Sequence, residues 1–384
     1  MPGISFPLMA SVLPASPTSE PSCAPPAVPP FPGRWVSLDA YRGWVMFTLL
    51  LGGVFHSLKG VSGWDWLYRQ NEHVAWAGCA YWDLIQPGFM FLVGAAIPLA
   101  RARRTALGES VARQWRHAAL RAANLVALGV WLDHVGAERV QVGFIRVLQQ
   151  IAPGYLLGFL LAGRGWRRQA MVAAAVLAGY HLLWVLNPWN GPRGPWAMGH
   201  ENLGGAVDRW ILGRNYSGYY VGLNAVPSAI TILFGVMAGE WVQGARPKSR
   251  ILGGLVAAGL AGVVVGWAVS PWMPLIKRIW TPSFAVFAGG WTTLMLAGFY
   301  WLVEMRGSHR AVFPLVVVGM NSTAAYVLGN AFGGWFRSAS GAWIGWLRGP
   351  LGEVGFPILQ RVAFAGAAWA VLYWLHRRRI FFKL

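Results

Sequence analysis

The chain has 384 residues, of which 56% are hydrophobic and only 12% are charged, roughly half the charged share of an ordinary soluble domain. This composition excludes a typical soluble fold and indicates an integral membrane protein. The net charge of +19 would suggest nucleic acid in a soluble protein, but the basic residues of membrane proteins collect on cytoplasmic loops. We therefore expect membrane lipid, and no nucleic acid, as a partner.

The first 33 residues form a distinct segment. They contain ten of the 24 prolines and neither Lys nor Arg. Such a composition cannot build a compact core, and it lacks the basic start of a secretory signal. We predict a disordered tail over 1–33, followed by one integral membrane domain over 34–384.

The rest of the chain contains repeated apolar runs of about the 20 residues that an α-helix needs to cross a membrane. The predicted fold is an all-α bundle of about ten transmembrane helices, with spans at 41–58, 81–100, 118–134, 147–163, 169–187, 225–243, 251–270, 284–304, 312–333 and 356–376. Glycine, with 49 residues, and tryptophan, with 24, suit close helix packing and the membrane interface.

The distribution of Lys and Arg tests this number of spans independently. If the N-terminus is cytoplasmic, the inside segments hold 20 of the 32 basic residues, and the longer outer segments hold the other 12 together with eight of the 13 acidic residues. Basic residues concentrate on the cytoplasmic side of a membrane. The pattern therefore favours an even number of spans, with both termini in the cytoplasm.

Asp39 and Arg42 stand at the predicted cytoplasmic start of the first span, in the segment RWVSLDAYRG at 34–43. Because they are three residues apart, they share a helix face and can form an ion pair, while Ser37 or Asp39 can cap the helix. The alternative is that Arg42 and the helix N-terminus bind the phosphates of a donor molecule. The spacing alone favours the cap and ion pair.

His73 and Asp83 stand on either side of the start of the second span. His73 lies in a segment rich in aromatic residues, among them Trp76, and Asp83 enters the apolar run. An ionisable residue at the edge of a span is costly enough to suggest a function. His73 is a natural general base, and Asp83 could orient its imidazole or accept a helix N–H group. The alternative is a solvated histidine and a simple helix cap.

Further polar residues lie within or beside later spans. Gln149 is just inside the fourth span and Asn321 is inside the ninth; buried amides commonly tie helices together, although either could line a channel. Lys277, Arg278 and Trp280 stand at the outer end of the eighth span. They could contact an anionic substrate, or anchor the chain at the interface, which is the commoner role.

No pattern in the sequence indicates a metal site. His200 and Glu201 are adjacent in the long outer segment 188–224, but no second His or Cys stands at a ligand spacing. The sequence also lacks the context of a phosphate-binding glycine loop or a serine nucleophile elbow. Cys23 and Cys79, the two cysteines, predict no disulfide framework.

Five segments stand out in order: SLDAYRG at 37–43, HVAWAGCAYWDLIQPGFMFLVGAAIP at 73–98, RVLQQIAPGYLL at 146–157, KRIWTPSFAVFAGGW at 277–291 and FPLVVVGMNSTAAY at 313–326. Taken together they resemble the heparan-α-glucosaminide N-acetyltransferase-like family of membrane acyltransferases, most closely its bacterial members. The resemblance covers roughly 34–382. No one segment is decisive, but five in the same order are specific.

The resemblance implies a protein of the bacterial inner membrane that transfers an acetyl or other acyl group from cytoplasmic acetyl-CoA to an amino sugar or hydroxyl of an extracytoplasmic glycan. The family's catalytic histidine lies in an H-x-x-W-x-G segment, which corresponds to His73, Trp76 and Gly78, and its D-L-x-x-P pattern corresponds to Asp83. The residues expected at the donor are Arg42, Asp39, Gln149 and Asn321, and those expected at the acceptor are Trp76, Lys277, Arg278 and Trp280.

Two departures from the family pattern bear on activity. Members commonly carry an Asn, thought to assist the histidine, near the outer end of the first span, where this sequence has Gly53 with His56 close by. A common R-I-P-G-V-L-Q-R pattern reads VGFIRVLQQ at 142–150. Its two arginine positions therefore fall on other residues.

Three functions from different classes compete. The leading hypothesis is an acyltransferase in which His73 deprotonates the acceptor and Asp83 orients the imidazole. The second is a transporter or flippase for a glycan or lipid, which broken helices or inverted repeats would favour; the sequence shows neither on inspection. The third is a non-catalytic membrane scaffold. The sequence does not fix the oligomeric state, for which a homodimer is one candidate.

Overall fold

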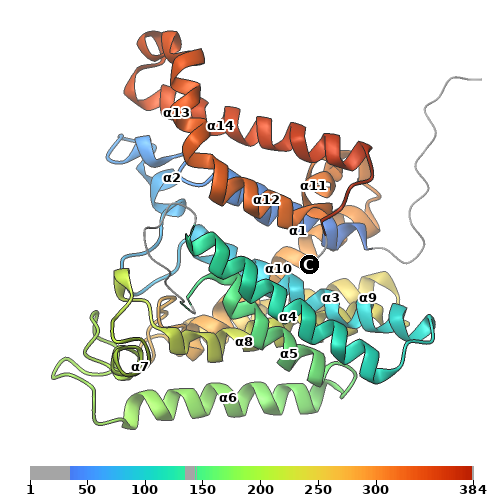
Figure 1. The fold of residues 1–384 in the computed structure, drawn as a ribbon. Coiled ribbons are helices and arrows are strands. Elements are labelled where there is room, and N and C mark those ends of the chain that lie inside the picture. The colour runs from blue at the N-terminus through green and yellow to red at the C-terminus, as the bar shows by residue number, and fades with distance from the viewer. Residues whose placement is uncertain (1–34, 135–142, 144, 383–384) are drawn as a thin grey trace, which may run out of the picture. The chain divides into compact units, whose positions relative to one another are not determined.

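The computed structural model describes residues 35–134, 143 and 145–382. The predicted disordered tail over 1–33 lies outside these residues. Throughout the described part of the chain the regular structure is helical and no strand occurs (Figure 1). Helices satisfy their backbone N–H and C=O groups within one segment, which is why they predominate in proteins that cross lipid. The all-α prediction is confirmed for the described residues.

Fourteen α-helices succeed one another in the described residues. They are α1 (Val36–Leu50), α2 (Asp65–Gln70), α3 (Ile85–Ala106), α4 (Val111–His134), α5 (Val147–Leu161), α6 (Trp166–Leu186), α7 (Leu203–Leu212), α8 (Ala225–Gln243), α9 (Lys248–Ala268), α10 (Pro282–Tyr300), α11 (His309–Met320), α12 (Ser322–Val327), α13 (Gly333–Ile344) and α14 (Arg348–Arg377). Short 3-10 or π turns lie between some of them: η1 (His56–Leu58), η2 (Tyr81–Leu84), η3 (Ser217–Tyr219), η4 (Gly222–Asn224), η5 (Trp301–Met305), η6 (Leu328–Phe332) and η7 (Gly345–Leu347).

Six helical stretches of the described chain are long and apolar enough to cross a membrane. They are Tyr81–Ala106, Trp166–Leu186, Ser217–Gln243, Lys248–Ala268, Pro282–Met305 and Ser322–Arg377. The last of these runs from α12 to α14 and is interrupted by turns. Together the six stretches indicate an integral membrane protein, while the finer prediction of ten spans goes beyond them.

The remaining predicted spans correspond to α1, α4, α5 and α11, which are shorter or more polar. With 15 residues, α1 is about 22 Å long at the 1.5 Å rise of an α-helix, less than the ~30 Å of a hydrocarbon core. In contrast, α4 is long enough but contains Arg113, Arg116 and Arg121. Ten spans would require these four helices to cross the membrane as well, and this number stays a prediction.

One predicted span boundary is wrong, and another predicted span contains a break. The first span was predicted to reach residue 58, but α1 ends at Leu50. The chain then turns at Gly53, whose φ of +72° favours glycine. The ninth span was predicted over 312–333, and within it Asn321 has a φ of −121° and a ψ of 41°, so α11 ends there and α12 begins.

Glycine residues allow α3 and α8 to approach backbone to backbone. A Cβ atom added to Gly94 would lie 1.9 Å from the carbonyl oxygen of Ile232, and one added to Gly235 would lie 2.0 Å from the carbonyl oxygen of Phe91. Both Ile232 and Phe91 are fully buried. Small residues commonly permit this close contact in membrane bundles, and here it brings η2 and the start of α8 into one core.

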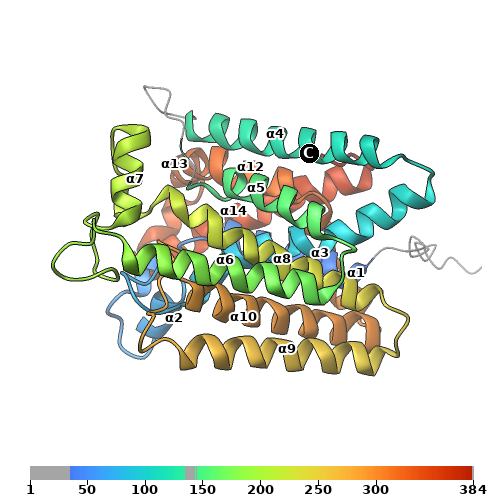
Figure 2. The same cartoon turned by 90° about the horizontal axis from the view of Figure 1, so that it is seen from below.

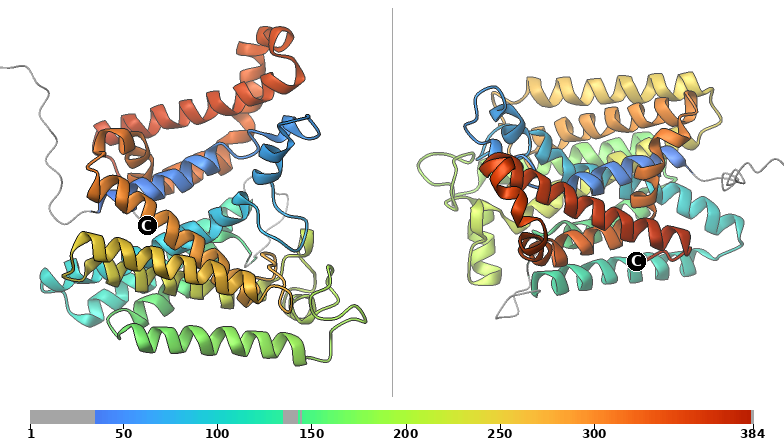
Figure 3. Two further views of the ribbon diagram at one scale, coloured as in Figure 1. Left: turned by 180° about the vertical axis from the view of Figure 1, so that it is seen from behind. Right: turned by 90° about the horizontal axis from the view of Figure 1, so that it is seen from above.

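The connections between helices gather at two opposite ends of the bundle. Figures 1 and 2 show α2, α7 and the loop between α9 and α10 at one end, and the turns from α3 to α4, from α5 to α6 and from α8 to α9 at the other. The views in Figure 3 agree and show that α1 begins, and α14 ends, at the second end. His73, which lies between α2 and η2, therefore belongs to the first end.

The close contact between α3 and α8 predicts that one added methyl group will lower the thermal stability of the protein. Gly235→Ala should lower the thermal unfolding midpoint of the purified protein, because overpacking of this kind typically costs about 1–3 kcal/mol. Gly253→Ala in α9 is the matched control, since a Cβ atom there would meet nothing within 4 Å. Equal midpoints for the two variants would contradict the close approach of α3 and α8.

Candidate functional site

His73 and Asp83 come together at the first end of the bundle. Asp83 lies in η2, and His73 lies in the loop that leads from α2 into that turn. The Nδ1 atom of His73 is 2.7 Å from the Oδ1 atom of Asp83. The side chain of His73 is 38% exposed, whereas that of Asp83 is 3% exposed. The pair therefore joins an accessible imidazole to a buried carboxylate.

The second carboxylate oxygen of Asp83 holds the loop that precedes it. Oδ2 accepts hydrogen bonds from the backbone N–H groups of Ala80, at 3.1 Å, and Val74, at 3.3 Å. The same loop is tied at Gly78, whose N–H group donates to the carbonyl of Leu275 at 2.8 Å and whose φ is +123°. Asp83 thus caps η2 and also orients the imidazole, the two roles that the sequence left as alternatives.

Lys277 adds a buried amine to this pair. Its Nζ atom lies 3.2 Å from His73 Nδ1 and 3.6 Å from Asp83 Oδ1. Only 6% of the residue is exposed, and this burial lowers its pKa to about 8, although the nearby carboxylate acts in the opposite direction. The sequence predicted Lys277 at the acceptor, and the structure brings it directly to His73 and Asp83.

The geometry indicates which imidazole nitrogen is available for chemistry. An ionised carboxylate can only accept hydrogen bonds, so the 2.7 Å contact with Asp83 requires the proton on Nδ1 of His73. Nδ1 cannot then also accept from Lys277, whose ammonium group instead balances the charge of Asp83 at 3.6 Å. Nε2 of His73 keeps its lone pair and can take a proton from a substrate.

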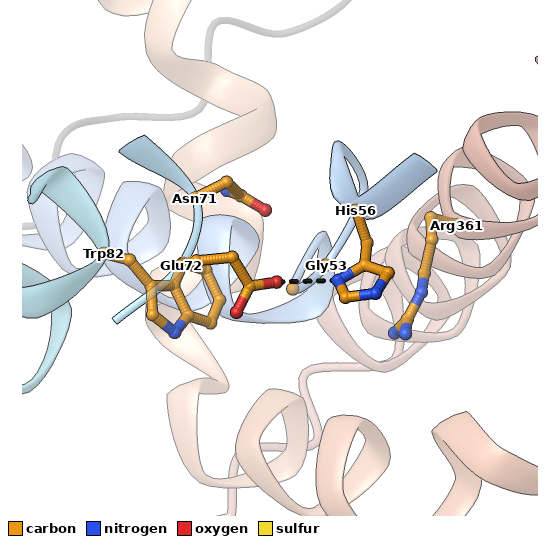
Figure 4. Close-up of a pocket in the computed structure, with 7 residues that line it drawn as sticks. Gly53, His56, Asn71, Glu72, Trp82 and Arg361 are labelled. Carbon is orange, nitrogen blue, oxygen red and sulfur yellow. Dashed lines mark hydrogen bonds and ion pairs between the residues drawn. The ribbon is translucent and has the colours of Figure 1, made fainter. Parts of the chain in front are cut away.

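A cavity of about 370 Å³ lies near the pair, although its lining residues do not include His73, Asp83 or Lys277. The residues that line it come from the turn after α1, the loop around α2, η2 and α14: Gly52, Gly53, His56, Asn71, Glu72, Trp82 and Arg361 (Figure 4). Glu72 and Trp82 directly precede His73 and Asp83 in the sequence. The ring centroids of Trp82 and His73 are 6.4 Å apart, so Trp82 contacts both the cavity and the neighbourhood of the imidazole.

The other three residues predicted at the acceptor make structural contacts instead. The indole N–H of Trp76 donates to the carbonyl of Trp196 at 2.7 Å. Arg278 donates to the carbonyl of Gly218 at 2.5 Å. Trp280 is fully buried, a position that does not fit contact with an acceptor from outside. Of the four predicted acceptor residues, the structure brings Lys277 to His73.

The residues predicted at the donor lie in separate places. The Nη1 atom of Arg42 donates to Asp39 Oδ1 at 3.0 Å, which is the ion pair that their spacing predicted. Gln149 donates to Asp133 at 3.1 Å and so links α5 to α4. Asn321 is fully buried and binds the C-terminal segment of the chain through both atoms of its amide. A common donor site for these residues stays a prediction.

A carboxylate already occupies the N-terminus of α1. Glu304 Oε1 accepts hydrogen bonds from the N–H group of Ser37, at 3.3 Å, and from its hydroxyl, at 3.0 Å. It therefore satisfies a helix N–H group that a phosphate would need. A donor phosphate at this helix end would have to displace Glu304. Neither Arg42 nor Asp39 is among the residues that line the cavity beside His73.

A chain of side-chain amides, which the sequence did not reveal, leads to the site. Gln86 Nε2 donates to Gln150 Oε1 at 2.6 Å, and Gln150 Nε2 donates to Asn224 Oδ1 at 2.5 Å. Asn224 Nδ2 then donates to the carbonyl of Arg278 at 3.1 Å, directly after Lys277. The chain ties α3, α5 and the start of α8 to the loop that carries Lys277. Amides within apolar runs were the only sequence signal for it.

The described residues contain no group of three or more His, Cys, Asp and Glu side chains that could hold a metal ion. His200 packs its ring against Tyr219, with 5.1 Å between the centroids, and Glu201 lies 3.9 Å from Arg193.

No model of a known protein family matches the chain, and no curated protein matches it either. The resemblance of the five sequence segments to membrane acyltransferases therefore stays a prediction. The geometry around His73 has to carry the argument for function.

The lowered pKa of Lys277 predicts a pH-dependent stability. Folded protein holds the amine neutral above a pH of about 8, whereas an unfolded lysine keeps its proton up to a pH of about 10.4. The unfolded chain thus binds more protons in this window, so the stability rises with pH. We expect this residue to add about 2 kcal/mol to the free energy of unfolding between pH 8 and pH 10.

Lys277→Met removes this titration and serves as the comparison. Thermal unfolding midpoints of the wild type and the variant should be measured in detergent from pH 7 to pH 10. The advantage of the wild type over the variant should grow as the pH rises. A difference that does not change with pH would show that the amine is not held neutral in the folded protein.

Proposed function

We propose that this protein is a membrane-bound acyltransferase that moves an acetyl or other acyl group from cytoplasmic acyl-CoA to an amine or hydroxyl of an extracytoplasmic glycan. The observation that carries the proposal is the 2.7 Å hydrogen bond from His73 to Asp83, beside a cavity. A histidine oriented by a buried carboxylate is a well-known form of general base. The resemblance of the same segment to acyltransferases suggests the class of reaction.

The proposed reaction balances its protons through His73. Acyl-CoA supplies the thioester. Nε2 of His73 takes a proton from the amine or hydroxyl of the acceptor while that atom attacks the thioester carbonyl carbon. The C–S bond then breaks, and the imidazolium returns its proton to the departing thiolate. Asp83 stabilises the imidazolium without becoming protonated, and it holds the ring in the required orientation.

The charges at the two ends of the bundle support a direction of transfer. The turns opposite the His73 end, with the adjoining helix ends, carry Arg103, Arg104, Arg164, Arg167, Arg168, Arg246 and Lys248. Basic residues mark the cytoplasmic side of a membrane, so we assign that end to the cytoplasm. Ten spans, both termini in the cytoplasm and the bacterial inner membrane complete this assignment. His73 then faces the side on which the acceptor glycan lies.

The donor is proposed to enter near Arg42. The hydroxyl of Thr48, near the end of α1, lies 3.2 Å from the hydroxyl of Tyr81 in η2, the turn that contains Asp83. Thr48 lies six positions after Arg42, about 9 Å along the helix axis, so α1 connects the two ends of the proposed path. A donor phosphate that binds Arg42 has to compete with Asp39 for the guanidinium.

A transporter for a glycan or lipid is the second candidate, because the break between α11 and α12 at Asn321 is of the kind found at transporter substrate sites. Here the amide of Asn321 is engaged with the chain itself. Its Nδ2 donates to the carbonyl of Ile380 at 3.0 Å, and its Oδ1 accepts from the N–H group of Phe382 at 3.1 Å. Local packing therefore accounts for the break, whereas the oriented imidazole of His73 favours a general base.

The proposal predicts that transfer depends on the His73 imidazole. Purified protein should be incubated with labelled acetyl-CoA and a panel of amino sugars and cell-envelope glycans. His73→Ala should lower the rate of transfer by about 10² to 10⁴, the usual contribution of a general base. The measurement is the label that appears on the acceptor.

His309→Ala is the matched control, because His309 is an exposed histidine at the start of α11, far from η2 in the sequence. This variant should keep the wild-type rate. Full transfer activity in His73→Ala would exclude His73 as the base. Failure of the wild type to bind acetyl-CoA at millimolar concentration would count against an acyltransferase altogether.

A further inference from the structure

Arg361 in the cavity beside His73 is a charged residue for which the sequence assigned no function. It lies on α14, within the apolar stretch Ser322–Arg377, and it is half-buried. Within the described part of the chain its guanidinium makes no hydrogen bond or ion pair. A charge in such a stretch is costly, and it is normally paired or faces a polar cavity. Here it lines the cavity.

The position of the guanidinium is fixed by its neighbours. A Cβ atom added to Gly53 would lie 3.3 Å from Arg361 Nη2, so the arginine packs against the bare backbone of that glycine. The hydroxyl of Ser57 donates to the carbonyl of Val354 at 2.8 Å and joins the turn after α1 to α14. Arg361 therefore occupies the space that a side chain at position 53 would need.

A second polar group of the cavity also lacks a partner. Asn71 is only 8% exposed, and its Oδ1 atom has no hydrogen bond within the described residues. A buried acceptor in this condition typically costs about 1–3 kcal/mol. In contrast, Glu72 Oε1 is 3.0 Å from His56 Nδ1, so the acid of the cavity is already paired (Figure 4). The cavity thus offers the guanidinium of Arg361 to a ligand.

We propose that this cavity is the acceptor subsite and that Arg361 binds a carboxylate or phosphate carried by the acceptor sugar. The inference rests on the proposed function, because it takes the molecule beside His73 to be the acceptor. A guanidinium binds either oxyanion through two parallel N–H bonds, and the Asn71 side chain lies in the wall of the same cavity. A volume of about 370 Å³ lies within the range of small-molecule sites, about 300–1,000 Å³.

The test compares sugars that share an amine but differ in acidity. Binding of labelled glucosamine, muramic acid and glucosamine 6-phosphate to the full-length protein in phosphatidylcholine nanodiscs should be measured by equilibrium dialysis. The wild type should bind both acidic sugars at least about tenfold more tightly than glucosamine, as expected of hydrogen bonds to a charged group. Arg361→Gln should bind all three sugars equally.

Arg310→Gln is the matched control, because it removes an exposed guanidinium of α11 that does not line the cavity. It should keep the preference for acidic sugars. Arg361→Lys, which keeps the charge but loses the planar fork, should retain only part of the preference, and it decides the matter if the Gln variant does not fold. Thermal unfolding midpoints show which variants are folded.

Equal binding of the three sugars by the wild type, or an unchanged preference in Arg361→Gln, would overturn the inference. The inference would also be overturned if short-chain phosphatidylglycerol displaced the acidic sugars at a lower concentration than one acidic sugar displaces the other. The site would then bind a lipid headgroup. Binding requires no acyl transfer, so the two proposals fail separately. If the protein shows an Arg361-dependent preference for acidic sugars but no acyl transfer, the subsite is supported and the acyltransferase proposal fails. If it transfers acyl groups without this preference, the acyltransferase is supported and the subsite proposal fails.

Discussion

The carboxylate of Asp83 is the point on which the geometry of the candidate site depends. A buried charge is costly unless partners surround it, and this one has an imidazole, two backbone N–H groups and an amine. These partners come from the loop before η2 and from the loop between α9 and α10. Satisfying one carboxylate therefore fixes the orientation of His73 and brings Lys277 beside it. Without Asp83 the two loops would lose their common partner.

The helical bundle supplies the rigid frame that this arrangement needs. Close contact between α3 and α8 through Gly94 and Gly235 brings η2 near the start of α8. The amide chain through Gln150 and Asn224 then reaches the backbone beside Lys277. Small residues and buried amides thus have different structural roles in one core. The glycines permit close packing, while the amides link particular helices at particular heights.

The sequence predicted the helical class and the pairing of His73 with Asp83, because apolar runs and an acid at the edge of a span follow from the cost of polar groups in lipid. It did not predict the end of α1 or the break at Asn321. The break depends on hydrogen bonds to the C-terminal segment, which no local pattern encodes. Lys277 was singled out, but its approach to His73 depends on a contact between distant loops.

Arg361 shows most clearly what a single sequence leaves out. Its position near the outer end of a predicted span is compatible with a simple interface anchor. Only the fold brings it into one cavity with Gly53 and Asn71. Position 53, where the sequence departs from the family pattern, is a glycine against which the Arg361 guanidinium packs. Side chains that meet across the bundle form the cavity, whereas the resemblance to acyltransferases is carried by short contiguous segments. His73 is the residue that both the sequence resemblance and the contacts across the bundle single out.

We propose that one protein passes an acyl group from its Arg42 end to an acceptor at its His73 end. Sealed vesicles that contain the purified protein, with glucosamine, muramic acid and glucosamine 6-phosphate trapped inside, test it most directly when labelled acetyl-CoA is added outside. We expect labelled sugar inside the vesicles from molecules whose Arg42 end faces the medium, and labelling at least about a hundredfold slower with His73→Ala. Trapped sugars that stay unlabelled with the wild type, or equal labelling with His73→Ala, would contradict it.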